Sequence, residues 1–587
     1  MRTEVRPASL VEVLERRAAE HPETVALVFV PERGSEHRQL TYAELRDRAH
    51  SAAASLLRRT GPGERAVLLF PPGLEFVVAF LGCLTAGVIA VPLMVPRRAA
   101  DRDSGTAIVA DCSPAIAMTT PDLLHRRPDV AERFASTGLD WLTVGIAGDP
   151  PTAPDIAPLR PSRDDIALLQ YTSGSTSTPK GVVVGHDNLL ANLEMVRVAM
   201  SNAWRSTFVG WVPHYHDMGL MMGVMQPLYL GGTSVLMTPA AFMQRPLNWL
   251  HIISRYRAEF ACAPNFAYDL CASRFRPEQM QGVDLSRWKL AMNGAEPVNA
   301  GTLERFSRTF APYGFDPGAG YPAYGLAEAT LQVSGGVRGR GPTSRDVSRA
   351  ALQRGEIAEP GGLDDRQTLV SCGRSVAGGD VAIVHPDTCC KLPSGRVGEI
   401  WVSGPHVARG YWRNEPATAE TFRARIAGAP DRDWLRTGDL GFIDQQGALF
   451  ITGRIKDLII IRGINHYPQD IERTVQASHP ALRRDCGAAF AISDDAGTEK
   501  LAVVQEVERT SLAGLNIADA TARIREAVTR QHEIAPAVIA LIPPAALPKT
   551  TSGKVQRGLT RRLLLDGALP VMPPAAAAAP PGAHSGN

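Results

Sequence analysis

The chain has 587 residues, of which 44% are hydrophobic and 21% are charged. This length exceeds what a single hydrophobic core usually supports, so the composition predicts a large globular protein with several domains. The 62 Lys and Arg residues nearly balance the 60 Asp and Glu residues, which gives a formal net charge of +2. We therefore expect no overall electrostatic attraction to nucleic acid or to an anionic membrane, and any partner must be recognised locally.

The eight cysteines are scattered along the chain without a CxxC pair, and the N-terminal sequence lacks the pattern of a secretory leader. These features are typical of reduced thiols, and they predict a cytoplasmic protein. Only Cys389 and Cys390 are adjacent. Because Pro386 and Pro393 lie nearby, we expect this pair in a turn, and redox chemistry is the alternative.

One stretch of the sequence imitates a membrane span. Residues 76–95, FVVAFLGCLTAGVIAVPLMV, carry no charge and are about long enough to cross a bilayer. Gly87 interrupts this run, however, and VIAVPL after it is typical of a short buried strand. We therefore expect a helix followed by a strand inside an α/β core, and no membrane span.

The N-terminal part of the chain alternates predicted helices and strands. Thr41 and Glu44 form a capping box that begins a helix, and buried strands are expected at 25–30 and 65–70. Helices are expected from about Leu74, near 187–200 and near 247–256, with a strand at 233–237. This alternation predicts an α/β fold whose mixed sheets are flanked by helices.

After about residue 395 the sequence becomes rich in short strands, and a small α+β domain is expected to follow Arg454. The Pro/Ala-rich end of the chain cannot bury enough surface to fold alone. We therefore predict a large N-terminal domain over 1–452, a small C-terminal domain over 453–566 and a disordered tail over 567–587.

The loop YTSGSTSTPKG, residues 171–181, follows a predicted strand and is crowded with hydroxyls and glycines. Consecutive backbone N–H groups and hydroxyls in such a loop can surround phosphate oxygens, and Lys180 adds positive charge at its edge. The loop does not match the G-x-x-x-x-G-K-[ST] pattern. Taken alone, it is equally compatible with a polar turn that binds nothing.

Four later segments change this interpretation, because they follow the loop in a fixed order. They are YGLAEAT (324–330), RTGDLGFI (436–443), GRIKDLIIIRGINHYPQDIE (453–472) and LPKTTSGKVQR (547–557). Together they resemble the core motifs of the adenylate-forming superfamily, which includes acyl-CoA synthetases and peptide synthetase adenylation domains. The similarity extends over about residues 9–566, and WVPHYHDMGLMMG (211–223) and APNFAYDLC (263–271) are most similar to fatty acyl-AMP ligases.

The resemblance implies a two-step reaction. A carboxylate does not acylate a thiol directly because hydroxide is a poor leaving group, so the family first makes an acyl-AMP and releases pyrophosphate. The acyl group then passes to a thiol and AMP leaves. Charge that develops on the phosphate oxygens calls for hydrogen-bond donors, Mg²⁺ and a lysine in the transition state.

Site residues follow from the same resemblance, motif by motif. Tyr324 would lie against the adenine with Gly325 in the same motif, Glu328 would ligate Mg²⁺, and the Thr330 hydroxyl would lie nearby. A solvated acid at a helix end is the alternative for Glu328. The loop residues expected to bind the β- and γ-phosphates of ATP are Thr172, Ser173, Gly174, Ser175, Thr176 and Lys180.

The remaining nucleotide contacts are expected from three further segments. Asp439 would accept hydrogen bonds from the ribose hydroxyls, with Arg454 beside it, and a solvated turn residue is the alternative for Asp439. The backbone in the NGAEP segment would form an edge of the adenine site. Its residues are Gly294, Ala295 and Glu296.

Lys554 would bridge the acyl carboxylate and the phosphate oxygens, and an exposed cation in a flexible loop is the alternative. His216 would line the path on which the carboxylate meets ATP, although a histidine in a structural turn fits as well. Lys456 lies where the family has its hinge. After adenylation, the C-terminal domain is expected to rotate and to withdraw Lys554.

The acid and the thiol are predicted from two stretches. The methionines after WVPHYHDMGL suit a flexible hydrocarbon wall, which favours a fatty acid over an amino acid, although a structural core would look the same. The polar stretch 339–367 resembles the insertion of fatty acyl-AMP ligases, which is thought to restrain the C-terminal domain and disfavour coenzyme A. A surface loop without a role is the alternative.

We therefore expect a ligase that uses ATP and Mg²⁺ to activate a medium- or long-chain fatty acid. No carrier domain follows Arg557, so the expected acceptor is the phosphopantetheine thiol of a separate acyl carrier protein in polyketide or peptide synthesis. Two alternatives stay open, an acyl-CoA ligase of the same fold and an inactive acyl-nucleotide-binding scaffold.

Overall fold

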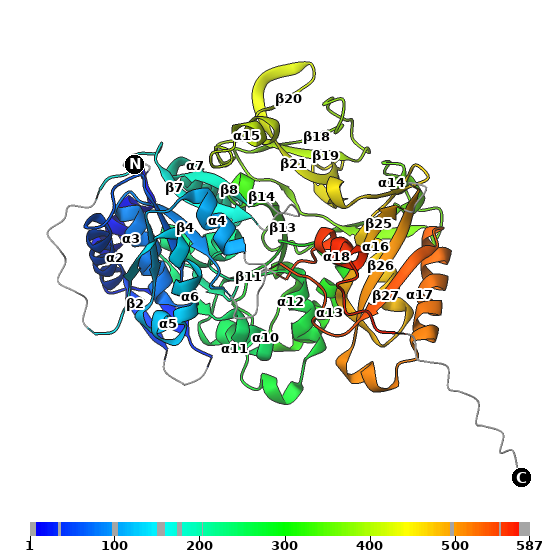
Figure 1. Cartoon of the computed structure of the whole chain (residues 1–587), viewed down its shortest axis with the longest axis horizontal. Coiled ribbons are helices and arrows are strands. Elements are labelled where there is room, and N and C mark those ends of the chain that lie inside the picture. Colours follow the sequence, from blue (N-terminus) through cyan, green and yellow to red (C-terminus); the bar gives the residue numbers. More distant parts are fainter. Residues whose placement is uncertain are drawn as a thin grey trace, which may run out of the picture. The chain divides into compact units, whose positions relative to one another are not determined.

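The computed structural model describes residues 7–32, 37–96, 104–148, 159–172, 179–201, 204–493, 498–550 and 553–573. The chain divides into two compact units (Figure 1). The first comprises Met1–Asp346 and Thr368–Ile451, and the second comprises Val347–Gln367 and Thr452–Asn587. The predicted disordered tail over 567–587 is wrong at its start, because Leu569 is buried and the Met572 N–H donates to the Leu541 carbonyl at 2.8 Å. Residues 574–587 lie outside the described residues.

Three sheets form the frame of the first unit, and two of them are built mainly from parallel strands. The nine-stranded sheet has the order β17 (Arg374–Ser375), β14 (Gln332–Gly335), β13 (Gly320–Gly325), β12 (Leu290–Asn293), β11 (Phe260–Ala263), β9 (Thr207–Gly210), β10 (Thr233–Met237), β1 (Val25–Val30) and β2 (Arg38–Thr41). The six-stranded sheet has the order β6 (Asp140–Thr143), β5 (Ile116–Thr119), β3 (Arg65–Leu69), β4 (Ile89–Leu93), β7 (Ile166–Thr172) and β8 (Lys180–Gly185).

The third sheet is antiparallel and lies later in the chain. It contains β18 (Asp380–Val384), β19 (Gly398–Ser403), β21 (Ala429–Ile443), β20 (Ala424–Ile426) and β22 (Leu449–Arg454), and the chain passes into the second unit within β22. Because parallel strands are covered on both faces, β3 and β4 read as continuous apolar runs and are buried almost throughout. The expected mixed sheets are confirmed.

Helices flank the sheets of the first unit (Figure 1). The Thr41 hydroxyl accepts from the Glu44 N–H, and the Glu44 side chain caps the backbone of Thr41, so the predicted capping box is present. The helices are α1 (Leu10–Glu20), α2 (Tyr42–Leu57), α3 (Leu74–Thr85), α4 (Ser104–Cys112), α5 (Pro121–Arg126), α6 (Pro128–Arg133), α7 (His186–Ala199), α8 (Asp217–Leu220), α9 (Gln226–Leu230), α10 (Pro239–Gln244), α11 (Leu247–Arg255), α12 (Asn265–Ser273), α13 (Ala300–Phe310) and α15 (Glu415–Phe422).

The apolar stretch 76–95 is divided between α3 and β4, as the sequence predicts. Gly87 takes a φ of +65° between them, a conformation that glycine adopts without strain. In the part of the chain that the structure describes, no helix combines the length and the apolar character needed to cross a bilayer. All eight cysteines are free, and Cys389 and Cys390 lie in a turn in which the Cys389 N–H donates to the His385 carbonyl.

The second unit is an α+β fold around one antiparallel and parallel sheet. Its strands are β25 (Leu482–Ser493), β26 (Glu499–Val507) and β27 (Pro536–Ile542). The helix α16 (Pro468–Ser478) precedes β25, α17 (Ile517–His532) connects β26 to β27, and α18 (Arg557–Leu565) follows β27. The hairpin of β23 (Ile459–Ile461) and β24 (Ile464–His466) precedes α16. Apolar side chains of α16 and α17, such as Ile471 and Ile524, are fully buried in its core.

The segment 347–367 belongs to the second unit, although the sequence analysis places the 339–367 insertion inside the first domain. The Gln367 side-chain amide donates to Asp470 Oδ2 at 2.6 Å, and the Tyr467 hydroxyl donates to the Leu352 carbonyl at 3.4 Å. Leu352, in the short helix α14 (Arg349–Gln353), is buried. These contacts explain why the segment folds with the later part of the chain. It is entered and left by the paired strands β15 (Ser344–Ser348) and β16 (Arg366–Val370).

Candidate active site

The polar loop connects the antiparallel strands β7 and β8. Residues 173–178 lie outside the described residues, as does the side chain of Thr172, so the predicted contacts of Ser173, Gly174, Ser175 and Thr176 stay predictions. Lys180 begins β8, and its Nζ lies 4.7 Å from the centroid of the Tyr411 ring. A cation over an aromatic face is held there by the quadrupole of the ring.

Two predicted nucleotide contacts from distant motifs meet directly. The Tyr324 hydroxyl, at the end of β13, donates to Asp439 Oδ2 in β21 at 2.6 Å. Both side chains are buried, and the Thr437 hydroxyl accepts from the Asp439 backbone N–H. A carboxylate has about four lone-pair sites, so Asp439 retains the capacity to accept further hydrogen bonds from a diol.

Glu328 lies in a single turn of 3₁₀ helix, Ala327–Ala329, that follows β13. Its Oε1 accepts a hydrogen bond from the Tyr411 hydroxyl at 2.9 Å, and its backbone carbonyl accepts from the Ala408 N–H at 2.9 Å. The segment 405–412 therefore contacts Glu328 through a side chain and through the backbone.

Thr330 has an unusual backbone conformation, with φ +63° and ψ −54°. The Leu331 N–H donates to the Ala329 carbonyl at 2.7 Å, so Thr330 is the central residue of a γ-turn of the rarer, strained hand. For a β-branched residue this conformation costs about 1–3 kcal/mol and persists only where the surroundings hold it. The Thr330 hydroxyl supplies part of that support, because it donates to the His406 carbonyl at 2.7 Å.

Gly325 lies where no other residue fits. A Cβ atom at this position would be 1.9 Å from the Leu331 carbonyl oxygen, which accepts from the Leu326 N–H. Residues 325–331 therefore form a tight loop that returns the chain to β14. This loop carries Glu328 and Thr330 at the carboxyl end of β13.

The NGAEP segment lies beside this loop, at the carboxyl end of the neighbouring parallel strand β12. A Cβ on Gly294 would lie 2.8 Å from the Ala323 carbonyl oxygen, so the two strand ends approach closely. Ala295 has a φ of +68°, and Glu296 Oε1 accepts from the Phe266 N–H at 2.6 Å at the start of α12. Ligands of open α/β sheets bind at such carboxyl ends.

His216 precedes α8, and its Nδ1 lies 2.6 Å from Asp217 Oδ1. The nearby His214 is buried against the Phe76 ring, and burial lowers its pKa to about 4. Met218, Met221, Met222 and Met225 are all buried. No three His, Cys, Asp or Glu side chains form a set of metal ligands within the described ranges.

Lys554 lies in the second unit, in a loop closed at its base by a backbone bridge between Lys549 and Val555. The Thr550 N–H donates to the Lys554 carbonyl at 2.7 Å, and the Thr550 hydroxyl accepts from the Lys554 N–H at 3.0 Å. Lys549 Nζ donates to the Asp485 carbonyl at 2.8 Å and contacts Cys486 Sγ at 3.2 Å. The first side of this loop is thereby fixed to β25.

Arg557 fixes the other side of the same loop. Its guanidinium binds both carboxylate oxygens of Glu472 at 2.7 Å and Asp457 Oδ2 at 3.1 Å. Asp457 directly follows Lys456, the predicted hinge residue, in the turn Ile455–Asp457. Arg454, the last residue of β22, also belongs to the second unit.

Residues 14–412 match the family model described as AMP-binding enzyme. The chain belongs to the AMP-binding enzyme family. Residues 456–572 match a second model, described as the AMP domain of Disco-interacting protein 2-like proteins. The order of motifs therefore led to the right superfamily.

Three relatives of this AMP-binding enzyme are similar over nearly their whole length. The medium-chain-fatty-acid–[acyl-carrier-protein] ligase JamA of Moorena producens is 42% identical, with 96% of each chain covered. The corresponding ligase TtuA of Teredinibacter turnerae is 34% identical, with 94% of this chain and 92% of that protein covered. The fatty acyl-adenylate ligase of L. pneumophila, solved with acyl adenylate and pyrophosphate, is 37% identical with a TM-score of 0.74, covering 97% and 98% of the two chains. The resemblance to fatty acyl-AMP ligases is confirmed.

In this AMP-binding enzyme the structure gathers most of the predicted nucleotide-site residues in the first unit. Tyr324 contacts Asp439 directly, and Glu328 and Lys180 both contact Tyr411. Lys554 and Arg454 belong to the second unit. Tyr411 is not predicted from the sequence, where its one signal is the GYW triplet at 410–412. Gly410 in this triplet has a φ of +139°.

Proposed function

We propose that this AMP-binding enzyme activates a medium- or long-chain fatty acid with ATP and transfers the acyl group to an acyl carrier protein. The first step gives acyl-AMP and pyrophosphate, and the second gives a thioester on a phosphopantetheine arm and AMP. The observation that carries this proposal is the similarity to JamA over 96% of each chain, because JamA is a ligase of medium-chain fatty acids and acyl carrier protein. The setting would be the cytoplasmic synthesis of a polyketide or a lipopeptide.

The side chains of the first unit suit the nucleotide half of the reaction. Tyr324 would lie against the adenine while its hydroxyl holds Asp439, which accepts hydrogen bonds from the ribose. The backbone at Gly294 and Ala295 would form the edge of the base site, beside the end of β13. Lys180 and the loop before it would neutralise the β- and γ-phosphates.

Magnesium fits the residues present. Glu328 offers a hard carboxylate oxygen, and the Thr330 hydroxyl lies two residues away on the same tight loop. Mg²⁺ usually binds one or two carboxylates together with substrate phosphates and water, so a single protein carboxylate is sufficient. Bound there, the ion would neutralise charge on the phosphate oxygens.

Lys554 would act only in the first step, by bringing its ammonium to the carboxylate and the α-phosphate. We propose that the small C-terminal domain then turns about Lys456 and withdraws Lys554 so that the thiol can approach. The contacts of Arg557 with Glu472 and Asp457 support movement of the lysine loop together with the hinge segment. His216 would line the path of the acid, in a position that its bond network with Asp217 and Met218 fixes.

An acyl-CoA ligase would differ from the proposed enzyme in the thiol that accepts the acyl group. The segment 347–367 packs on α16 and on the end of α17 within the second unit, through Gln367 and Arg349. A restraint on the movement of that unit would disfavour coenzyme A and favour a carrier protein that docks on the enzyme. An inactive scaffold would not require Lys554, Glu328 and Asp439 together.

The proposal is tested with purified protein, ATP, Mg²⁺ and a series of fatty acids of increasing chain length. Coenzyme A or a phosphopantetheinylated carrier protein is added, and products are identified by mass spectrometry. We expect acyl-AMP that persists with coenzyme A and is consumed by the carrier protein. Rapid formation of acyl-CoA would identify an acyl-CoA ligase, and no adenylate with any acid would identify an inactive scaffold.

A further inference from the structure

Tyr411 lies between two charged side chains that would serve different parts of the nucleotide. Its hydroxyl donates to Glu328 Oε1 at 2.9 Å, and its ring centroid lies 4.7 Å from Lys180 Nζ. Glu328 would hold the metal and Lys180 would bind the phosphates. One aromatic residue therefore contacts both the carboxylate for the metal and the ammonium for the phosphates.

The backbone around Tyr411 is bound to β8, the strand that Lys180 begins. The Arg409 N–H donates to the Val183 carbonyl at 3.0 Å, and the Val183 N–H donates to the Gly410 carbonyl at 2.9 Å. The Trp412 N–H donates to the Gly181 carbonyl at 2.7 Å. Residues 409–412 therefore run along the edge of the β7–β8 hairpin, where Tyr411 and Val182 form an isolated antiparallel bridge.

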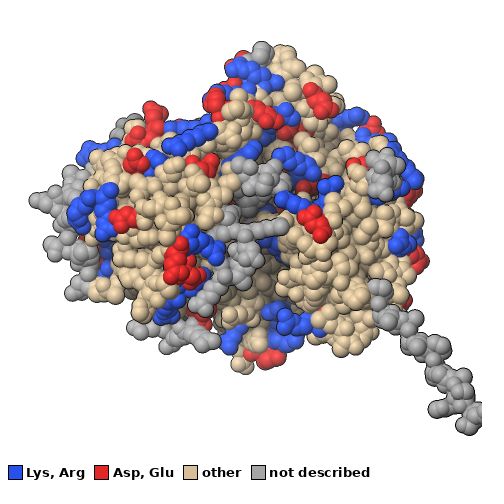
Figure 2. All heavy atoms as spheres, in the orientation of Figure 1, with Lys and Arg blue, Asp and Glu red and all other residues tan. Residues whose placement is uncertain are grey.

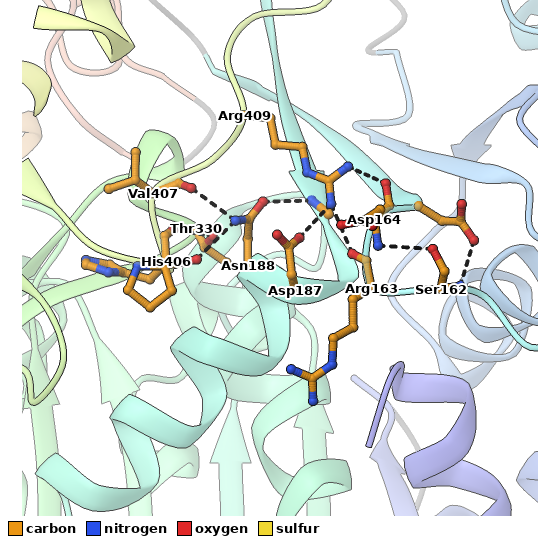
Figure 3. A network of polar contacts seen from close by, with 12 residues as sticks. Ser162, Arg163, Asp164, Asp187, Asn188, Thr330, His406, Val407 and Arg409 are labelled. Carbon is orange, nitrogen blue, oxygen red and sulfur yellow. Dashed lines mark hydrogen bonds and ion pairs between the residues drawn. The ribbon is translucent and has the colours of Figure 1, made fainter. Parts of the chain in front are cut away.

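Side chains of the α7 region hold the segment 405–412 from its other side (Figure 3). The Asn188 amide donates to the Pro405 and Val407 carbonyls at 3.0 and 3.1 Å. The Arg409 guanidinium binds Asp187 Oδ1 at 2.7 Å and the Arg163 carbonyl at 3.0 Å. Lys and Arg side chains are interspersed with Asp and Glu over the visible face of the molecule (Figure 2).

A third set of bonds joins the segment to the Glu328 loop. The Ala408 N–H donates to the Glu328 carbonyl, and the Thr330 hydroxyl donates to the His406 carbonyl, which Figure 3 shows beside Asn188. The segment is thus fixed to the strand of Lys180 and to the loop of Glu328 at the same time. A side chain on it can set the distance and orientation between the two charges.

The packing around Tyr411 fixes its position. The Phe422 ring packs edge-on against the Tyr411 ring, with 5.0 Å between the ring centroids, and the Thr418 hydroxyl accepts from the Tyr411 backbone N–H at 2.9 Å. The Tyr411 hydroxyl is therefore held as a donor at the Glu328 carboxylate.

We propose that Tyr411 is a positioning residue that orients the Glu328 carboxylate for Mg²⁺ and holds the Lys180 ammonium for the phosphates. A hydrogen bond to one oxygen fixes the rotation of a carboxylate ligand, and loss of such a partner typically weakens metal binding or activity by 10–100-fold. The face of the ring limits where the ammonium can lie. This inference rests on the proposed adenylation reaction.

The decisive variant is Tyr411→Phe, which removes the hydroxyl and keeps the ring against Lys180 and Phe422. We expect two Mg²⁺ concentrations to rise by about tenfold: that for half-maximal acyl-AMP formation, and that which half-saturates the ATP-dependent rise in melting temperature without fatty acid. The KM for ATP at saturating Mg²⁺ should change by less than about twofold. A Mg²⁺ dependence within twofold of wild type would overturn the proposal. Wild-type protein that makes no acyl-AMP would instead overturn the proposed function.

Tyr229→Phe is a matched control, because the Tyr229 hydroxyl also donates to a glutamate, Glu194, at 2.9 Å. Its partner lies on α7, so we expect no change in the Mg²⁺ dependence. An equal shift in both variants would show a general effect of a lost tyrosine hydroxyl and would overturn the assignment to Tyr411.

The contact between the Tyr411 ring and the Lys180 ammonium is tested separately with Lys180→Met, which leaves Tyr411 and Glu328 in place. We expect a higher KM for ATP, and we expect Tyr411→Leu to raise this KM by roughly three- to tenfold in the wild type but not in the Lys180→Met background. In the same way, Tyr411→Phe should have no further effect in a Glu328→Gln background. Additive effects in both double variants would overturn the proposal.

Discussion

The two lysines that the motifs assign to ATP are held by different means. Lys180 begins a strand of the first unit, and its neighbours are sheet backbone and an aromatic ring. Lys554 lies in a loop of the second unit, and one side of that loop is fixed by the hydrogen bond of Lys549 to the Asp485 carbonyl and the other by the ion pairs of Arg557. The position of Lys180 in a sheet suits a cation that stays with the nucleotide throughout the reaction. The loop of Lys554 is fixed within the second unit, which suits a cation that moves to and from the nucleotide together with that unit.

The largest effect is expected when the ion pairs of Arg557 with Glu472 and Asp457 are removed from the second unit. Arg557→Met leaves the buried Glu472 and the nearby Asp457 without their cation, which should lower stability by about 3–5 kcal/mol. Hydrogen exchange measured by mass spectrometry should show faster exchange in α16 and α18, with the first unit unchanged. Arg561→Met, on the same helix but exposed, is the control. Equal rates of hydrogen exchange in both variants would contradict the stabilising role of the Arg557 ion pairs.

Removal of the second lysine should affect one half of the reaction. Because Lys554 would contact the transition state of adenylation only, Lys554→Ala should slow acyl-AMP formation by about 10²–10³-fold, or about 2.7–4 kcal/mol. Transfer from preformed acyl-AMP to a carrier thiol should keep its wild-type rate. Lys500→Ala, an exposed lysine of the same unit, should change neither step. Wild-type adenylation in Lys554→Ala would refute the assigned role.

A smaller loss is expected when the first anchor of the loop is removed. Lys549→Met loses the bond to the Asp485 carbonyl, worth about 1.5 kcal/mol for a charged donor, and should slow adenylation by about tenfold. Cys486→Ala keeps that bond and should cost less. The transfer step should again be unchanged, so a loss shared equally by both steps would indicate general destabilisation of the unit and not a loosened loop.

The smallest effect is expected at the nucleotide site of the first unit. Tyr324→Phe keeps the ring and removes the bond to Asp439, which should raise the KM for ATP by about fivefold, or about 1 kcal/mol. The rate at saturating ATP should change little, because the base and ribose are bound equally in the ground and transition states. A fall in the maximal rate without a change in KM would place this pair in the chemical step.

Much of the fold could be predicted because local patterns decide it. The strands Val25–Val30 and Thr233–Met237 have the bounds expected from their apolar runs, and Thr41 begins α2 with its capping box. The assignment of 347–367 to the second unit could not be predicted, since it depends on bonds such as that between Gln367 and Asp470, which are distant in sequence.

The same limit applies to the site. Tyr324, Glu328 and Asp439 belong to motifs with their own sequence signals, and the structure brings Tyr324 and Asp439 into contact. Tyr411 has only an inconspicuous GYW triplet, and its importance follows from what surrounds it in space. A residue that acts through others leaves little trace in a single sequence.

Gly325 has a consequence for how mutational scans of this protein should be read. A Cβ at this position would overlap the Leu331 carbonyl, so every substitution would displace the loop that carries Glu328. Such a scan would rank Gly325 with the residues that bind the nucleotide, although it has no side chain with which to bind anything. Intolerance to substitution at Gly325 would reflect the close approach of two backbone segments and not a contact with the nucleotide. A comparison of ATP affinity with the yield of folded protein would separate these two causes.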